Sequence, residues 1–245
     1  MTSVILLVLG AIVGSFLNVL GLRWNSGLSL GGRSACAHCG KTLKWWELVP
    51  ILSFLFLQGR CSLCHVRISW QYPVVEIWTG LLFTTLPYIF LPIFCLYTVI
   101  TIYDFRHKII PDSLVYSAIV LAFLTAFFTQ HSLIDWLTGP ILFTFLGLIW
   151  FLSRGRAMGF GDAKLSLSIG LLLGAATGFS AVILSFWIGA LVGLFLVVRS
   201  RVYPLLRRSK RITMNSEVPF APFLVLGAWL AVVLHLDLLH VSLFF

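Results

Sequence analysis

This sequence has few charged residues. Only 10% of its 245 residues are charged, and only eight are acidic, whereas a soluble domain has about 25% charged residues. Hydrophobic residues make up 60% of the chain. Folded in water, such a chain would expose a largely apolar surface, so an ordinary soluble domain is excluded. The lipid bilayer is the expected solvent.

Three familiar patterns are also missing. The apolar run 4–22 has no basic segment before it and no small-residue cleavage site after it, so we expect a retained first span rather than a signal peptide. No internal repeat is evident. No G-x-G-x-x-G turn stands between a strand and a helix, so a cofactor site of the dinucleotide-binding kind is not expected.

Apolar stretches of about the length needed to cross a bilayer recur along the chain. A spanning helix needs about 20 mostly apolar residues. The candidates are residues 4–22, 71–88, 90–105, 113–129, 136–152, 164–175, 179–198 and 218–240. The sequence therefore predicts an all-α polytopic membrane protein of about eight transmembrane helices. We divide it into a first helix (1–22), a small cytoplasmic loop module (23–70) and a seven-helix membrane core (71–245).

The 17 Lys and Arg residues are confined to four segments. They follow the first, third, fifth and seventh predicted spans, and none lies in the other connections or at either terminus. Because basic connections stay in the cytoplasm, we expect both termini outside. The net charge of +9 then reflects membrane topology, and no nucleic-acid partner is expected.

The cytoplasmic module contains two C-x-x-C pairs. Four thiolates from two tight turns suit a closed, structural zinc site, and a disulfide is not expected in a reducing compartment. The predicted ligands are Cys36, Cys39, Cys61 and Cys64. The alternative is four unpaired thiols in a loop. His38 and His65 lie in or beside the turns and are expected to be bystanders.

The acidic residues are few enough to consider one by one. They are Glu47, Glu76, Asp104, Asp112, Asp135, Asp162, Glu217 and Asp237. An acid near the hydrocarbon is costly and is a functional candidate. We expect Glu47 and Asp135 to be solvated. Glu76 lies about one turn inside the second predicted span and needs a polar partner, and Glu217 is expected at the start of the last helix.

Asp104 and Asp162 lie at one depth, the cytoplasmic edge of the predicted membrane region. Two neighbouring carboxyl groups can share a proton, so that one activates water while the other donates to a carbonyl oxygen. Gly159 and Gly161 would allow a tight turn and a close approach of substrate. Each acid also has a simpler role: Asp104 could pair with a nearby cation, and Asp162 could cap a helix. We expect Asp112 to act as a helix cap.

Several motifs together resemble the type IV prepilin peptidase family along nearly the whole chain. They are Gly14-Ser-Phe-Leu-Asn18, the two C-x-x-C pairs, Val49-Pro-Ile-Leu-Ser53, Ile68 to Glu76, Asp104 to Asp112, Gly159-Phe-Gly-Asp162-Ala-Lys164 and Pro219-Phe-Ala-Pro222. The order of these motifs is far more specific than G-x-G-D alone.

This resemblance implies an intramembrane aspartic peptidase of the G-x-G-D type, with Asp104 and Asp162 as its catalytic pair. Such enzymes cut a basic leader from pilin-like and pseudopilin precursors at the cytoplasmic face of the bacterial inner membrane, so the resemblance implies that location for this protein. They serve pilus assembly, type II secretion or DNA uptake in competence. Many also N-methylate the new amino terminus with S-adenosylmethionine, but the sequence does not place that cofactor, and Glu47, Glu76 and the cysteine loop are the first region to consider.

Three alternatives remain at this stage. The chain could be a peptidase without methyltransferase activity. It could be a proton-coupled transporter, although buried charges in transporters usually lie near the midplane. It could also be a scaffold that docks through its zinc module, but that role leaves the G-x-G-D motif unexplained.

Overall fold

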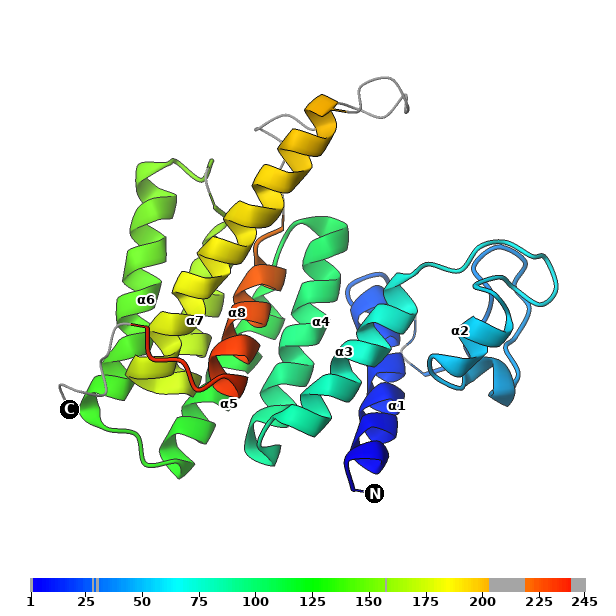
Figure 1. The fold of residues 1–245 in the computed structure, drawn as a ribbon, viewed down its shortest axis with the longest axis horizontal. Helices are drawn as coiled ribbons and strands as arrows, with labels where there is room; N and C mark the ends of the chain where they lie inside the picture. The colour runs from blue at the N-terminus through cyan, green and yellow to red at the C-terminus, as the bar shows by residue number, and fades with distance from the viewer. Residues whose placement is uncertain (1, 28, 30, 157, 203–218, 239–245) are drawn as a thin grey trace. The chain divides into compact units, whose positions relative to one another are not determined.

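The computed structural model describes residues 2–27, 29, 31–156, 158–202 and 219–238 (Figure 1). Among these residues, regular structure is helical, and β-type pairing is confined to two isolated bridges. The all-α prediction is therefore confirmed. The chain divides into two compact units, Met1–Ile102 and Tyr103–Phe245.

The first unit contains a helical hairpin and the loop module. Its helices are α1 (Thr2–Arg23), η1 (Trp45–Leu48), α2 (Leu52–Phe56), α3 (Gln71–Thr85), η2 (Tyr88–Phe90) and most of α4 (Leu91–His107). Helix α1 packs closely on α3 through glycines. A Cβ atom at Gly10 would lie 2.6 Å from the carbonyl oxygen of Thr79, so the two backbones touch where a larger residue would separate them.

The second unit is built around α7. It holds the end of α4, α5 (Asp112–Phe128), α6 (Leu133–Leu152), α7 (Phe160–Val202) and α8 (Ala221–Val233). Helix α7 packs on α5, α6 and α8. Gly139 and Gly170 bring α6 and α7 together, because a Cβ atom at Gly170 would lie 2.7 Å from the Cα atom of Gly139.

Helix α7 is not one straight rod. Gly174 has φ 70° and ψ −169°, outside the helical region, and only glycine adopts such a conformation readily. The chain doubles back there, since a Cβ atom at Gly178 would lie 3.5 Å from the Cα atom of Gly170. The sixth and seventh predicted helices are therefore the two arms of α7.

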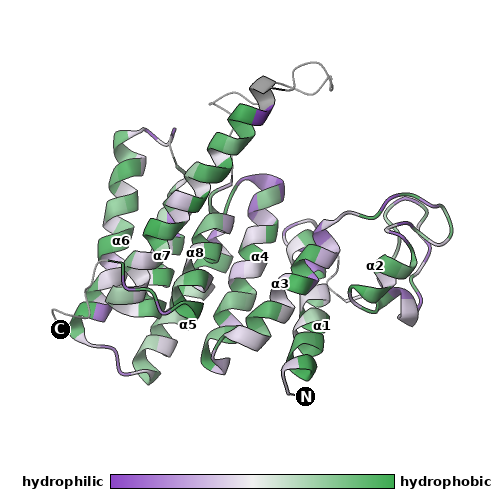
Figure 2. Cartoon of the chain, viewed as in Figure 1, coloured by the Kyte–Doolittle hydropathy of each residue, from purple (hydrophilic) through white to green (hydrophobic). Residues whose placement is uncertain are grey.

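The apolar helices fit a bilayer (Figure 2). Among the described residues, four helical segments are long and apolar enough to cross a membrane: Thr2–Arg23, Tyr88–His107, Leu133–Leu152 and Phe160–Arg199. Asp112–Phe128 and Ala221–Val233 are shorter apolar helices. These helices support the prediction of a membrane protein, whereas the number of eight spans stays a prediction. Glu217 lies outside the described residues.

Candidate functional site

Asp104 lies in the last turn of α4, and its side chain is buried, with 4% of its surface exposed. Its carboxylate accepts the backbone N–H of Ala221, the first residue of α8. Its Oδ2 atom is buried and has no hydrogen-bond partner among the described residues. A helix N-terminus favours an anion through its free N–H groups and its dipole, so α8 stabilises a charge on Asp104. One oxygen is left for another ligand.

Asp162 lies in the first turn of α7 and is also buried, with 7% exposed. Its Oδ2 atom accepts the backbone N–H of Gly159 at 3.3 Å, the return bond of a capping box. Asp162 therefore does help to cap α7, as the simpler reading of the sequence predicted. The charge of Asp104 also acts on this carboxyl group, so the two predicted acids lie in one unit and near enough for one charge to influence the other.

Gly161 allows the start of α7 to approach the segment before α5. A Cβ atom at Gly161 would lie 2.9 Å from the Cβ atom of Ile110. The space beside this glycine is therefore filled by the protein itself, whereas we expected it to admit substrate. In the G-x-G-D turn, Gly161 is needed because Ile110 packs directly against it.

An ion pair fixes the same turn from the side of α5. Lys164 Nζ lies 2.6 Å from Asp112 Oδ1 and about 5 Å from the ring centroids of Tyr116 and Phe160, within the range of cation–π attraction. The capping prediction for Asp112 is wrong: the N-cap position of α5 is Pro111, without a side-chain cap bond. The carboxylate instead reaches across to α7.

The spacing of Asp162 and Lys164 gives this ion pair a directional effect. Residues two apart on an α-helix point about 200° apart. Lys164 faces α5 through Asp112, so Asp162 faces the other way, where the charge of Asp104 acts on it. The ion pair therefore sets the rotation of the first turn of α7.

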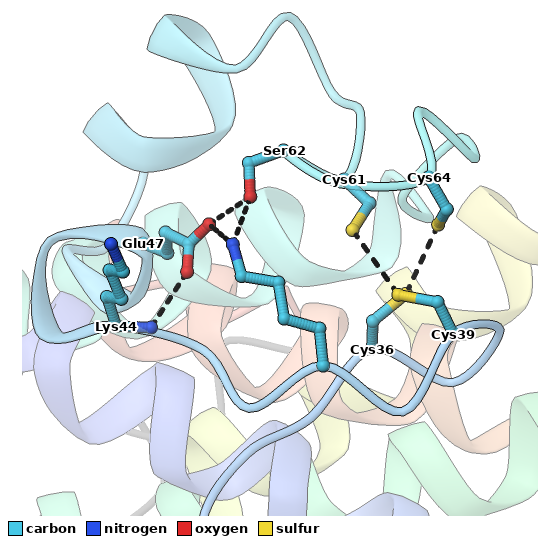
Figure 3. A network of polar contacts seen from close by, with 8 residues as sticks. Cys36, Cys39, Lys44, Glu47, Cys61, Ser62 and Cys64 are labelled. Atoms are coloured by element: carbon cyan, nitrogen blue, oxygen red, sulfur yellow. Dashed lines mark hydrogen bonds and ion pairs between the residues drawn. The ribbon is translucent and has the colours of Figure 1, made fainter.

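The cysteine cluster forms as the sequence predicts (Figure 3). All four Sγ atoms lie within 4.8 Å of one another, with Cys36–Cys64 at 3.8 Å and Cys39–Cys61 at 4.0 Å. A tetrahedral zinc with Zn–S bonds of about 2.3 Å needs sulfur–sulfur distances of about 3.8 Å. The donor set therefore fits zinc, and among the described residues no histidine joins this group.

A buried carboxylate holds the two cysteine turns together. Glu47 Oε1 accepts Lys41 Nζ at 2.8 Å and the hydroxyl of Ser62, while Oε2 accepts the backbone N–H of Lys44 at 2.7 Å. Lys41 follows the first cysteine pair and Ser62 lies inside the second. The prediction that Glu47 is solvated is wrong: it is 7% exposed, and Lys41, then Lys44, then Ser62 lower its pKa to about 2.

Glu76 has the partners that its place in a predicted span requires. Oε2 accepts the backbone N–H of Ile51 at 2.8 Å, and the carboxylate also accepts the hydroxyl of Ser15 on α1. Next to it, Asn18 of α1 donates to the carbonyl oxygen of Tyr72. These bonds join α1, α3 and the loop module in the first unit, so Glu76 has a structural place there.

Asp135 has a partner that the sequence did not indicate. It was expected to be a solvated interfacial acid and is only partly buried, but its Oδ1 atom also accepts the backbone N–H of Ala175 at 2.8 Å. It thereby caps the second arm of α7 at the Gly174 break. The Ala221 N–H beside Asp104 was also missed, although Pro219-Phe-Ala-Pro222 marked the start of that helix in the sequence.

Two family models match this chain. Residues 8–90 match the bacterial peptidase A24 N-terminal domain, and residues 89–194 match the type IV leader peptidase family. No solved structure matches significantly.

Curated relatives match over almost the whole chain. A prepilin leader peptidase/N-methyltransferase of Bacillus subtilis is 35% identical, covering 93% of this chain and 92% of that protein. One of Pseudomonas putida is 30% identical, covering 92% and 88%. One of Pseudomonas aeruginosa is 29% identical, covering 92% and 88%. Because this similarity extends along almost its whole length, the chain belongs to the type IV leader peptidase family.

Proposed function

We propose that this protein is a prepilin leader peptidase that cleaves the leader from pilin-like or pseudopilin precursors, with Asp104 and Asp162 as its catalytic pair. The observation that carries the proposal is a pair of buried carboxyl groups in one unit, each bound by a backbone N–H near a helix start and near enough for the charge of one to influence the other. Family membership and the printed function of the relatives support the same reaction.

The two acids divide the work of peptide hydrolysis. One carboxylate takes a proton from water, and the resulting hydroxide adds to the scissile carbonyl carbon while the other carboxyl group donates a proton to the carbonyl oxygen. The C–N bond then breaks as the acid that took the proton from water passes it to the leaving amine. The other acid recovers its proton from a hydroxyl group of the tetrahedral intermediate as the new carboxyl group forms. Asp104 Oδ2, which has no partner among the described residues, is available to hold the water. The N–H groups of Ala221 and Gly159 stabilise whichever acid is ionised.

The proposed topology is eight spans, with both termini outside and the active site at the cytoplasmic face of the inner membrane. The confinement of all 17 cations to four segments supports it. Under this arrangement, residues 1–22, 23–70 and 71–245 are the first helix, the loop module and the membrane core. Active alkaline phosphatase fused to the C-terminus, in a host with a periplasm, is the expected result. An inactive but stable fusion would contradict the topology.

The loop module binds one structural zinc in this proposal, through Cys36, Cys39, Cys61 and Cys64. A closed shell of four sulfurs leaves no position for water, so the metal supplies folding stability and takes no part in hydrolysis. The pKa of Cys36, lowered to about 6 by the backbone N–H groups of Cys39 and His38, favours the thiolate that a metal requires.

A second activity is N-methylation of the new amino terminus with S-adenosylmethionine. The printed names of the relatives include N-methyltransferase, and this is the observation that favours it. No residue is assigned to the cofactor. A peptidase without this activity remains the alternative.

One experiment tests both activities. The protein is co-expressed with a pilin precursor, and the mature pilin is analysed by mass spectrometry. Loss of the leader mass supports the peptidase. A mature pilin that is heavier than the unmodified product by the mass of one CH₂ group supports the methyltransferase. Uncut precursor beside correctly inserted protein would contradict the proposal and favour a non-proteolytic role such as proton-coupled transport.

A further inference from the structure

The loop module contains an apolar segment that the proposed peptidase mechanism does not use. Residues 48–57 read LVPILSFLFL, and they include the short helix α2. Three side chains of α2 are largely exposed: Leu52 is 51%, Leu55 62% and Phe56 82% accessible. Adjacent large apolar side chains left uncovered on a module mark a surface that contacts something apolar.

The start of α2 is fixed deep on the α1–α3 hairpin. Ile51 donates its backbone N–H to Glu76 at 2.8 Å, and Glu76 lies five residues beyond Gln71, the first residue of α3. At about 1.5 Å per residue, this is about 7.5 Å along the helix. Ser15, the partner of Glu76 on α1, lies eight residues before Arg23, or about 12 Å from that end of α1. Both helices thus place the start of α2 inside the level of their ends.

The backbone is bent to make this bond. Ile51 has φ 62° and ψ −52°, and Leu52 donates its N–H to the carbonyl oxygen of Pro50 at 2.6 Å. This is a γ-turn of the rare, strained kind, and a β-branched residue at its centre is unfavourable. Such strain persists only where the surroundings enforce it. Here the enforcing bond is the one to Glu76.

A second contact fixes which face of α2 is exposed. The ring of Phe54 lies 4.9 Å from that of Trp70, the residue just before α3, and it also covers Gly59. Phe54 therefore faces the module, while Leu55 and Phe56 face away from it. Trp70 itself is 71% exposed, and tryptophan at the end of a spanning helix is typical of the membrane–water interface.

The charge of the module as a whole matches a lipid surface. Residues 24–70 contain five basic residues and one acid. Lys44, Arg60 and Arg67 are exposed, while the acid, Glu47, is buried with Lys41. Exposed basic residues on a module that also carries an apolar helix face attract anionic headgroups.

We propose that α2 is embedded in the cytoplasmic leaflet, with Leu52, Leu55 and Phe56 among the acyl chains and the exposed cations at anionic headgroups. The module is then supported on the bilayer by α2, beyond its two covalent connections to α1 and α3. This placement concerns residues of the first unit alone and does not depend on the peptidase activity.

A photo-crosslinking experiment on the full-length protein tests this placement. p-Benzoylphenylalanine replaces either Leu55 or Leu63 in separate variants, reconstituted in nanodiscs of phosphatidylglycerol and phosphatidylcholine. The two positions are matched, since Leu63 is 63% exposed, but it lies between Cys61 and Cys64 at the tip of the second cysteine turn. After illumination, mass spectrometry measures covalent lipid adducts. We expect at least about fivefold more lipid adduct at position 55 than at 63, as its apolar surroundings require.

Equal lipid yields at the two positions would overturn the proposal, and so would crosslinking of position 55 to protein, whether a second copy or a bound precursor. Phe56→p-benzoylphenylalanine, which keeps an aromatic ring, serves if the Leu55 variant fails to insert. The same excess over position 63 is expected there. Its absence, in protein that retains its zinc, would equally contradict the placement of α2.

Discussion

The loop module and the helical second unit achieve order in opposite ways. In the module, regular structure among the described residues amounts to two short helices and two isolated bridges, and its fixed points are four sulfurs and the carboxylate of Glu47. In the second unit, apolar helices approach closely at small residues, as Gly139 and Gly170 do.

This contrast shows which kind of interaction stabilises each region. A short module cannot bury enough apolar surface to fold, so charged hydrogen bonds and, in the proposal above, metal binding replace a core. Within lipid there is little hydrophobic force between helices, and close packing of small residues replaces it. The buried polar residues of the second unit include Asp104 and Asp162.

The largest expected effect lies in the second unit. Asp104→Asn or Asp162→Asn keeps side-chain size but removes an ionisable group, and each should lower precursor cleavage by at least about a thousandfold. The double variant should lose little more than either single one, because the acids act as a unit. Cleavage is measured on purified protein and precursor. Near wild-type cleavage by either correctly inserted single variant would refute the dyad.

The module should respond to loss of its sulfurs without loss of the helices. Cys61→Ser combined with Cys64→Ser should reduce bound zinc from about one per chain to almost none, because two ligands of a closed shell are gone. Limited proteolysis should then cut within residues 24–70 while the helical content stays. Cys95→Ser, a change in α4 outside the cluster, is the matched control. Wild-type protein without zinc, with four titratable thiols, would disprove the metal site.

Packing in the second unit can be tested at a single methyl group. Gly170→Ala would place a Cβ atom 2.7 Å from the Cα atom of Gly139, and should lower the free energy of unfolding by about 1–3 kcal/mol. Gly147→Ala on α6 meets no atom within 4 Å and should raise it by up to about 1 kcal/mol through helix propensity. Denaturation in detergent measures both. Equal effects would show that close packing between α6 and α7 is unimportant.

The smallest effect is expected at the ion pair beside the dyad. Lys164→Met should let the first turn of α7 rotate and so misplace Asp162. Because a small misplacement of a catalytic group slows the reaction, kcat should fall about tenfold, with KM almost unchanged. Stability should fall by less than about 1 kcal/mol, because Asp112 is exposed. Lys164→Arg should restore much of the rate. Wild-type kcat in the Met variant would remove the positioning role from this pair.

Much of the fold could be predicted because its signals are local. Apolar runs gave helix positions to within a few residues for most elements, and the repeated C-x-x-C spacing identified four thiols that do converge. The last helix was predicted too long: α8 ends at Val233. The dyad stays a prediction, although both acids are buried and the charge of Asp104 influences Asp162.

Most of the missed features involve long-range partners. Glu47 is bound by Lys41 and Lys44 nearby, but also by Ser62, 15 residues away, and the role of Asp135 depends on Ala175, 40 residues away. No periodicity in the sequence encodes such partners. Asp112 was misjudged because its position at a helix start suited a cap, whereas its partner Lys164 lies 52 residues along the chain.

The break at Gly174 also bears on how the protein is made. A straight helix over the apolar stretch Phe160–Arg199 would measure about 60 Å, twice the hydrocarbon thickness of about 30 Å. Because its two arms meet without a polar loop, we expect them to leave the translocon together as one hairpin. An epitope tag inserted after Gly174 would pull Ala175 away from Asp135, so this turn should tolerate insertion poorly.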